Sequence, residues 1–218
     1  MKVISVNVGL PREVASNGGR VTTGIFKSPV SGSVPVRRLN LAGDRQADLT
    51  VHGGPYKAVY AYPIEHYPKW RGELPELELP MGAFGENLTV EGLDENTLHI
   101  GDRLRIGTSV LVVTQPRMPC YKLGIRFQRD DMIKRFLASG RSGFYFSVEE
   151  EGEVSPGSGI EILSRDPHEV RVADIQLLYL HQNKDATLLD RAVQVDALPD
   201  SWRTWLIERA EGTRSRSG

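Results

Sequence analysis

A strand-rich segment, GDRLRIGTSVLVVTQPRMPCYKL at residues 101–123, indicates both the fold class and the first candidate site. Its first half contains two runs of apolar and β-branched residues, 104–106 and 110–114, and such runs favour strands. Gly-Asp and Gly-Thr pairs bracket the first run, as they do in hairpin turns. The segment therefore predicts a β-hairpin that leads into a proline-flanked cysteine.

Short strands separated by glycine and proline are predicted along residues 1–165. Apart from the hairpin, the strand-like runs are 3–8, 34–41, 59–62, 143–148 and 159–163. Many short strands joined by turns are typical of a barrel or sandwich, not of alternating strands and helices. Two helices are expected among them, at 64–70 and at 131–138, with Asp130 or Asp131 as N-cap of the second. Residues 1–165 are therefore predicted to form a mainly β domain.

Residues 166–212 are predicted to form a small unit of three helices. Helical spacing of apolar residues covers 172–181, 187–195 and 201–211. Asp185 and Asp200 are the candidate N-caps, and Gly212 is the candidate C-terminal stop. Helices of about ten residues are marginally stable alone, so their apolar stripe is expected to pack against another surface. The stripe consists of Leu198, Trp202, Trp205 and Leu206. Residues 213–218 are expected to be a disordered tail.

The composition excludes several classes of protein. The net charge of −1 gives no general attraction to nucleic acid, and the sequence has no run of about 18 apolar residues to span a membrane. The single cysteine excludes an intrachain disulfide and a cluster held by four cysteines. Because the first residues lack the apolar region of a signal peptide, we expect a cytoplasmic protein.

Cys120, the only cysteine, is the main candidate for chemistry. A thiol beside fixed positive charge ionises more easily, and the thiolate is both a nucleophile and a metal ligand. Pro116 and Pro119 fix φ on either side, which predicts a rigid turn instead of a helix interior. No acid occurs between residues 115 and 129, whereas four bases do: Arg117, Lys122, Arg126 and Arg129. A buried core cysteine is the alternative, but an apolar core would not tolerate these charges unpaired.

Two further segments contain polar groups suited to ligand binding. The HGGP sequence at 52–55 predicts a tight loop with exposed backbone amides. These amides, together with His52 and Lys57, are suited to bind an anion. The alternative is that His52 only caps a turn. Asn87, in FGENLT at 84–89, can donate and accept hydrogen bonds, which suits the edge of a pterin or purine. Its alternative role is to bond the local backbone of a turn.

Taken in order, these motifs resemble the MOSC domain, which is related to the C-terminal part of molybdenum cofactor sulfurase. The short helical unit at 168–212 is similar to that of the stand-alone YiiM-like branch. One departure is Tyr56, where an acidic residue is common before Lys57. The resemblance implies a β-barrel that holds a molybdenum–pterin cofactor, with Cys120 as the metal ligand. The motifs that carry it are GDRQAD at 43–48, HGGP at 52–55, AVYAYPIEHY at 58–67, FGENLT at 84–89 and TQPRMPCYKL at 114–123.

The resemblance also implies a function, the reduction of N-hydroxylated compounds such as hydroxylaminopurine-type base analogues. A thiolate suits the sulfur ligands that the pterin gives the metal. His52 and His66 are the candidates for proton delivery, because unperturbed histidine titrates near pH 6.5; equally, His66 could be a packed residue on a helix face. The residues expected to hold the cofactor are Arg117, Lys122, Lys57, Asn87, Gly53, Gly54 and Arg126.

The sequence leaves the electron donor and two other functions open. Because the chain has no flavin, haem or iron–sulfur motif, electrons are expected from a separate partner reductase. A homodimer is compatible with the sequence. One alternative function is a sulfur or cofactor carrier that uses a Cys120 persulfide, and the other is a cofactor-binding module without turnover. Labile sulfur on Cys120 would identify a carrier, whereas molybdenum and pterin that co-purify would identify a reductase.

Overall fold

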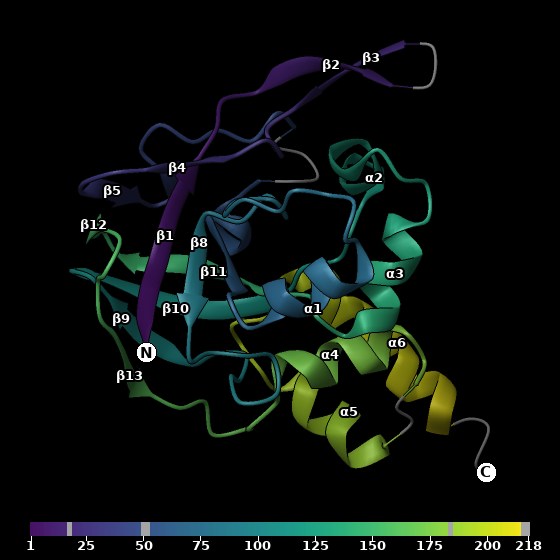
Figure 1. Ribbon diagram of the computed structural model, residues 1–218. Coiled ribbons are helices and arrows are strands. Elements are labelled where there is room, and N and C mark those ends of the chain that lie inside the picture. Colours follow the sequence, from purple (N-terminus) through teal and green to yellow (C-terminus); the bar gives the residue numbers. More distant parts are fainter. Residues whose placement is uncertain (17–18, 49–52, 183–184, 215–218) are drawn as a thin grey trace.

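A curled sheet of eight strands forms the main body of the computed structural model, which describes residues 1–16, 19–48, 53–182 and 185–214 (Figure 1). The strand order is β13-β9-β10-β11-β7-β8-β1-β4, and all neighbours are antiparallel except the parallel pair β7–β8. The strands are β1 (Lys2–Val8), β4 (Ser28–Val30), β7 (Val59–Pro63), β8 (Leu88–Glu91), β9 (Arg103–Ile106), β10 (Ser109–Pro116), β11 (Phe144–Glu150) and β13 (Ile160–Ser164).

Backbone hydrogen bonds between β1 and the start of β13 join the two ends of this sheet. The Val3 amide donates to the Ser158 carbonyl at 2.9 Å, and the Gly157 amide donates to the Val3 carbonyl at 2.8 Å. The Ile160 amide also donates to the Met1 carbonyl at 3.1 Å. Because β13 is at one end of the strand order and β1 is near the other, these bonds close a barrel and leave few unpaired edges. The predicted mainly β fold is confirmed.

Two smaller sheets flank the barrel. The first contains β5 (Val34–Arg37), β6 (Asn40–Leu41) and β12 (Gly152–Val154), so that a turn divides the single strand predicted at 34–41. The second is a hairpin of β2 (Arg12–Ser16) and β3 (Gly19–Thr23) that extends away from the body (Figure 1). The sequence did not reveal this hairpin because its strands are mostly polar and lack an apolar face.

Three helices and the aromatic residues around them cover one side of the barrel. They are α1 (His66–Glu73), α2 (Tyr121–Phe127) and α3 (Met132–Ser139). A second hydrophobic cluster lies among them, with Tyr62, Trp70 and Phe84 fully buried. Asp131 occupies the predicted N-cap position of α3, but its carboxylate binds Arg129 and Arg135 in place of the helix amides. Helix α2 was not predicted.

The C-terminal unit contains the three expected helices, α4 (Val172–Tyr179), α5 (Ala186–Val193) and α6 (Asp200–Arg214). The Asp185 side chain accepts from the Thr187 amide at 2.9 Å, so it is the predicted N-cap of α5. The predicted stop at Gly212 is wrong, since α6 continues to Arg214 and so takes in the first two residues of the predicted tail. Residues 215–218 lie outside the described residues.

The apolar stripe that runs from Leu198 into α6 is part of the same hydrophobic core as the barrel. Leu198 and Leu206 are fully buried in a cluster that also contains Val113 of β10, and Trp202 and Trp205 pack against it. The expectation that this stripe is covered is therefore confirmed.

Replacing Leu206 with alanine should destabilise the protein by about 2–5 kcal/mol, because it opens a cavity in that shared core. Ile207→Ala is the matched control on the same turn; Ile207 is 40% exposed, and its loss should change stability by about 0.5 kcal/mol or less. Urea unfolding of both variants measures the difference. Equal midpoints would mean that α6 contributes little to the core.

Candidate functional site

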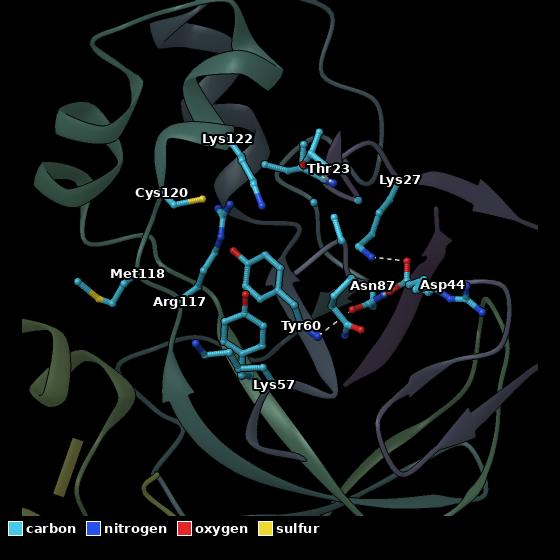
Figure 2. A pocket seen from close by; sticks show the side chains of 17 residues that line it. Thr23, Lys27, Asp44, Lys57, Tyr60, Asn87, Arg117, Met118, Cys120 and Lys122 are labelled. Atoms are coloured by element: carbon cyan, nitrogen blue, oxygen red, sulfur yellow. Dashed lines mark hydrogen bonds and ion pairs between the residues drawn. The ribbon is translucent and has the colours of Figure 1, made fainter. Parts of the chain in front are cut away.

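A solvent-open cavity of about 660 Å³ lies where four loop segments meet at one end of the barrel (Figure 2). Its lining comes from residues 23–27, 44–47, 57–60 and 117–122, together with Gly85 and Asn87 before β8 and Tyr145 of β11. Among the described residues that line it, one is acidic, Asp44, and five are basic: Lys27, Arg45, Lys57, Arg117 and Lys122. The cavity is therefore strongly electropositive.

The thiol of Cys120 opens into this cavity. Cys120 has extended backbone, with φ of −121° and ψ of 173°, and it immediately precedes α2. Its side chain is partly exposed and forms no disulfide. Figure 2 shows the sulfur pointing toward the guanidinium of Arg117. The prediction of a thiol outside a helix interior is confirmed, and the alternative of a core cysteine does not fit this exposure.

Arg117 is a buried cation in the cavity wall, only 6% exposed. Its Nη1 is buried and has no hydrogen-bond partner among the described residues. The guanidinium carbon lies 5.2 Å from the ring centre of Tyr60 and 5.1 Å from that of Phe136. Burial acts to lower the pKa of Arg117, but Tyr60, Tyr145 and Cys120 together raise it, so the guanidinium stays charged. A charged donor without a protein partner suits an anionic ligand.

Two lysines complete the positive charge near the thiol. Lys122 is 8% exposed and lies in the first turn of α2. Lys57 ends the 3₁₀ turn η1 (Pro55–Lys57), which begins after Gly54. Gly54 has φ of +91°, a conformation that a residue with a side chain rarely adopts. Burial lowers the pKa of Lys57, and the Cys120 thiolate opposes that effect.

The other two bases of the cysteine segment lie elsewhere, which corrects the expectation that all four surround the thiol. The guanidinium of Arg126 lies 5.2 Å from the ring centre of Phe26, and Arg126 does not line the cavity. Arg129 forms ion pairs with Glu76 and Asp131. Arg126 is one helical turn beyond Lys122, about 6 Å along the axis, which places it beyond the wall.

Asn87 lines the cavity, but its amide is already bonded within the protein. Its Oδ1 accepts from the Tyr60 amide at 3.1 Å, and its Nδ2 donates to Asp44 at 2.9 Å and to the Asn7 carbonyl at 3.4 Å. Both donor hydrogens are therefore used. This arrangement favours a structural role over direct recognition of a ligand edge.

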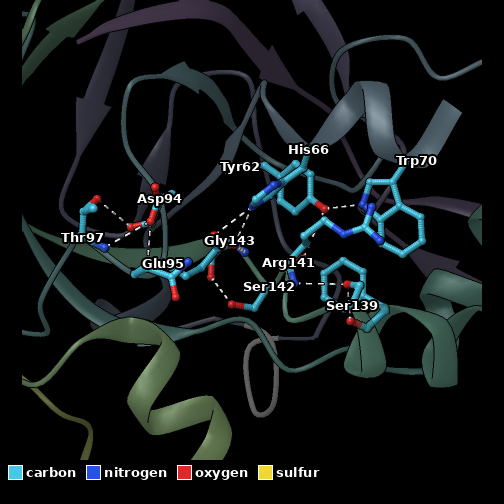
Figure 3. Close-up of polar contacts among 12 residues, drawn as sticks. Tyr62, His66, Trp70, Asp94, Glu95, Thr97, Ser139, Arg141, Ser142 and Gly143 are labelled. Atoms are coloured by element: carbon cyan, nitrogen blue, oxygen red, sulfur yellow. Dashed lines mark hydrogen bonds and ion pairs between the residues drawn. The ribbon is translucent and has the colours of Figure 1, made fainter. Parts of the chain in front are cut away.

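His66 lies in a separate buried network, not among the residues that line the cavity (Figure 3). Its Nε2 is 2.8 Å and 3.1 Å from the two carboxylate oxygens of Glu95, which also accepts from the Gly143 amide. Through Glu95, in the loop after β8, these bonds join α1 to Gly143 just before β11, which supports the packing alternative. His52 lies outside the described residues, whereas Gly53 and Gly54 are described and do not line the cavity.

The site also contains residues that sequence reasoning missed. Lys27 and Asp44 line the cavity as an ion pair, and Arg45 lies beside them. Asp44 belonged to a quoted motif, but nothing in that motif indicated its partner.

In the described part of the chain, no group of three or more His, Cys, Asp or Glu side chains could hold a metal, and no helix is long and apolar enough to cross a membrane.

His66→Gln should lower the free energy of unfolding by about 1–3 kcal/mol, because a buried hydrogen-bond partner of Glu95 is displaced. His168→Gln, a change at a half-buried histidine near the start of the C-terminal unit, serves as control and should have little effect. Chemical denaturation of the two variants provides the comparison. An undiminished stability of His66→Gln would contradict the structural role.

Two family models match the chain. The MOSC domain model matches residues 48–161, and the model of the YiiM-like 3-alpha helix domain matches residues 172–206. YflK, an uncharacterized protein of Bacillus subtilis, is 43% identical over 96% of this chain and 94% of its own length. YiiM of Escherichia coli is 38% identical over 86% of this chain and 85% of its own.

A further relative and two solved structures extend the comparison. A protein of Gibberella moniliformis named "Reductase" is 35% identical over 82% of this chain, which spans only 32% of that protein. The crystal structure of YiiM from Geobacillus stearothermophilus matches with a TM-score of 0.80 and 34% identity, over 96% of this chain and 98% of that one. The structure of Escherichia coli YiiM matches with a TM-score of 0.76 and 30% identity, over 97% and 94%. The chain therefore belongs to the MOSC-domain family and to its YiiM-like branch.

Proposed function

We propose that this protein binds a molybdenum–pterin cofactor and reduces N-hydroxylated compounds, with Cys120 as the metal ligand. The observation that carries the proposal is the meeting of the only thiol with Arg117, Lys57 and Lys122 in one cavity. Membership of the MOSC family supports it, since such domains are associated with this cofactor.

The residues of the cavity fit such a group. A thiolate is a soft ligand of the kind that suits a metal already bound by sulfur. No group of three or more His, Cys, Asp or Glu side chains among the described residues could hold a metal, so the pterin would have to supply ligands in addition to Cys120. The buried Nη1 of Arg117 and the ammonium groups of Lys57 and Lys122 would bind the anionic groups of the cofactor. When bound, the cofactor would supply a metal centre that passes two electrons.

The reaction requires electrons and protons from outside the cofactor. Reduction of R–NHOH to R–NH2 and water consumes two electrons and two protons. A partner reductase would supply the electrons, and the fungal protein named "Reductase" supports this, because two thirds of it lie outside the region that this chain matches. The protein's own residues would bind the substrate and deliver protons.

Expression in a host that makes the cofactor provides the first test. We expect purified protein to contain molybdenum and pterin, and to reduce hydroxylaminopurine when a reduced viologen dye supplies the electrons.

Cys120→Ser should lose molybdenum while its circular dichroism and melting temperature stay close to those of the parent, since a hydroxyl is a harder ligand and stays protonated. Molybdenum content equal to that of the parent would reject the ligand assignment. Labile sulfur on Cys120 without molybdenum would support the carrier function in its place.

Lys122→Ala should weaken cofactor retention, because a charge-assisted hydrogen bond of this kind contributes about 1.5–3 kcal/mol. Lys134→Ala on α3, an exposed lysine, is the matched control. Gel filtration at increasing salt followed by metal analysis measures retention, and the difference between the two variants should grow with salt as the remaining ionic contacts are screened. Identical retention curves would assign Lys122 a role other than binding.

A further inference from the structure

The cavity wall opposite Cys120 contains a buried ion pair that the proposed function does not use. The ammonium of Lys27 binds the carboxylate of Asp44, and their side chains are 8% and 0% exposed. Both residues line the cavity, and Figure 2 draws them on the far side from Cys120. A ligand that fills the cavity would therefore reach the thiol at one end and this pair at the other.

The structure fixes the position of the Lys27 ammonium through Asp44. Besides Lys27, Asp44 Oδ1 accepts from the Gly9 amide at 2.9 Å, and Oδ2 accepts from Asn87 Nδ2 at 2.9 Å. The carboxylate is thus held by donors from three separate segments. The segment that carries Lys27 is also closely packed, because a Cβ on Gly24 would lie 2.4 Å from the Arg45 carbonyl oxygen. The ammonium is preorganised at the cavity wall.

An ammonium group has three donor hydrogens, and Asp44 is the one hydrogen-bond acceptor recorded for Lys27 among the described residues. The remaining donors are free to contact a ligand. Burial lowers the pKa of Lys27, and the negative charges of Asp44 and Glu86 oppose that effect. The other charged or titratable groups that line the cavity are Arg45, Lys57, Arg117, Lys122, Cys120, Tyr60 and Tyr145. Buried lysines are suited to acid–base chemistry because their affinity for protons is adjustable.

Other groups in the cavity are less suited to proton donation. Arg117 does not release its proton, and the hydroxyl of Tyr60 donates to the Ser142 carbonyl at 2.8 Å. His66 is bonded to Glu95 away from the cavity. Lys57 and Lys122 lie on the side of the thiol, where the proposed cofactor needs their charge.

We propose that Lys27 is the proton donor of this cavity and that Asp44 is the residue that positions it. This inference rests on the proposed reduction of N-hydroxylated compounds. The N–O bond of R–NHOH breaks, and the nitrogen is reduced by two electrons that originate from the partner reductase. One proton goes to the nitrogen and one to the oxygen, which leaves as water. Lys27 gives the proton that the oxygen takes up and regains one from solvent.

Lys27→Met, Lys27→Arg and the double variant Lys27→Met/Asp44→Asn test this role, with the exposed Lys69→Met on α1 as control. The double variant avoids leaving a buried carboxylate unpaired, which alone could destabilise the fold. Melting temperature, molybdenum and pterin content, and kcat and KM for hydroxylaminopurine with reduced viologen are measured from pH 6 to pH 10.

The methionine variants should retain the cofactor, with kcat lowered by about 100- to 10,000-fold, as for loss of a general acid. The parent should lose activity as pH rises through the pKa of Lys27, which burial places below the ordinary value of 10.5, and this alkaline fall should disappear in the variants. Lys27→Arg should not recover kcat, because arginine keeps the charge but does not release a proton.

Three results with the variants would overturn the inference alone. One is recovery of kcat in Lys27→Arg, which would show that only the charge matters. A second is a parental kcat and pH profile in the methionine variants. The third is loss of cofactor from both methionine variants but not from Lys27→Arg, which would make Lys27 a binding residue. If the cofactor-loaded parent itself reduces no N-hydroxylated compound, the proposed function fails, and this inference fails with it.

Discussion

The hydrogen bonds of Asn87 hold together the three segments on which the cavity depends. Its backbone amide donates to the Tyr60 carbonyl at 2.8 Å, and its carbonyl accepts from the Asn7 amide at 2.7 Å. Its side chain bonds Tyr60, Asn7 and Asp44. A single buried amide thus joins β7, β1 and the loop of Asp44, and satisfied networks of this kind impose a unique geometry. This amide therefore contributes to fixing both the backbone of Tyr60 and the carboxylate of Asp44 in the cavity wall.

The neighbouring Glu86 strengthens the same junction. It is fully buried, and it accepts hydrogen bonds from the Tyr67 hydroxyl, the Thr89 hydroxyl and the amides of Gly82 and Phe84. Burial raises its pKa, and these donors act in the opposite direction. A buried carboxylate is tolerated only when it is bonded in this way. The polar FGENLT motif therefore stabilises the site through hydrogen bonds within the protein.

Sequence reasoning found the part of the site that is contiguous in the chain and missed the part that folding assembles. Cys120, Arg117 and Lys122 are neighbours in sequence, so their shared charge pattern was visible before the fold was known. Lys27 and Asp44 are separated by 17 residues, and although Asp44 belongs to the GDRQAD motif, nothing in the sequence indicates that Lys27 is its partner. The role of His66 depended on Glu95, 29 residues away, and one histidine in a helical pattern could not indicate that partner.

The C-terminal helices stabilise the cavity wall although they contribute no residue to its lining. Trp202 Nε1 donates to Gln115 Oε1 at 2.8 Å, and Gln115 Nε2 donates to the Tyr56 carbonyl at 3.2 Å. Tyr56 precedes Lys57, and Gln115 is two residues before Arg117, so this chain of bonds reaches two cations of the site. Because α6 also shares the apolar core of the barrel, the helices and the barrel are energetically coupled. The helical unit is therefore better understood as a support for the positively charged wall than as an independent appendage, since like charges held close together require a rigid scaffold to oppose their repulsion.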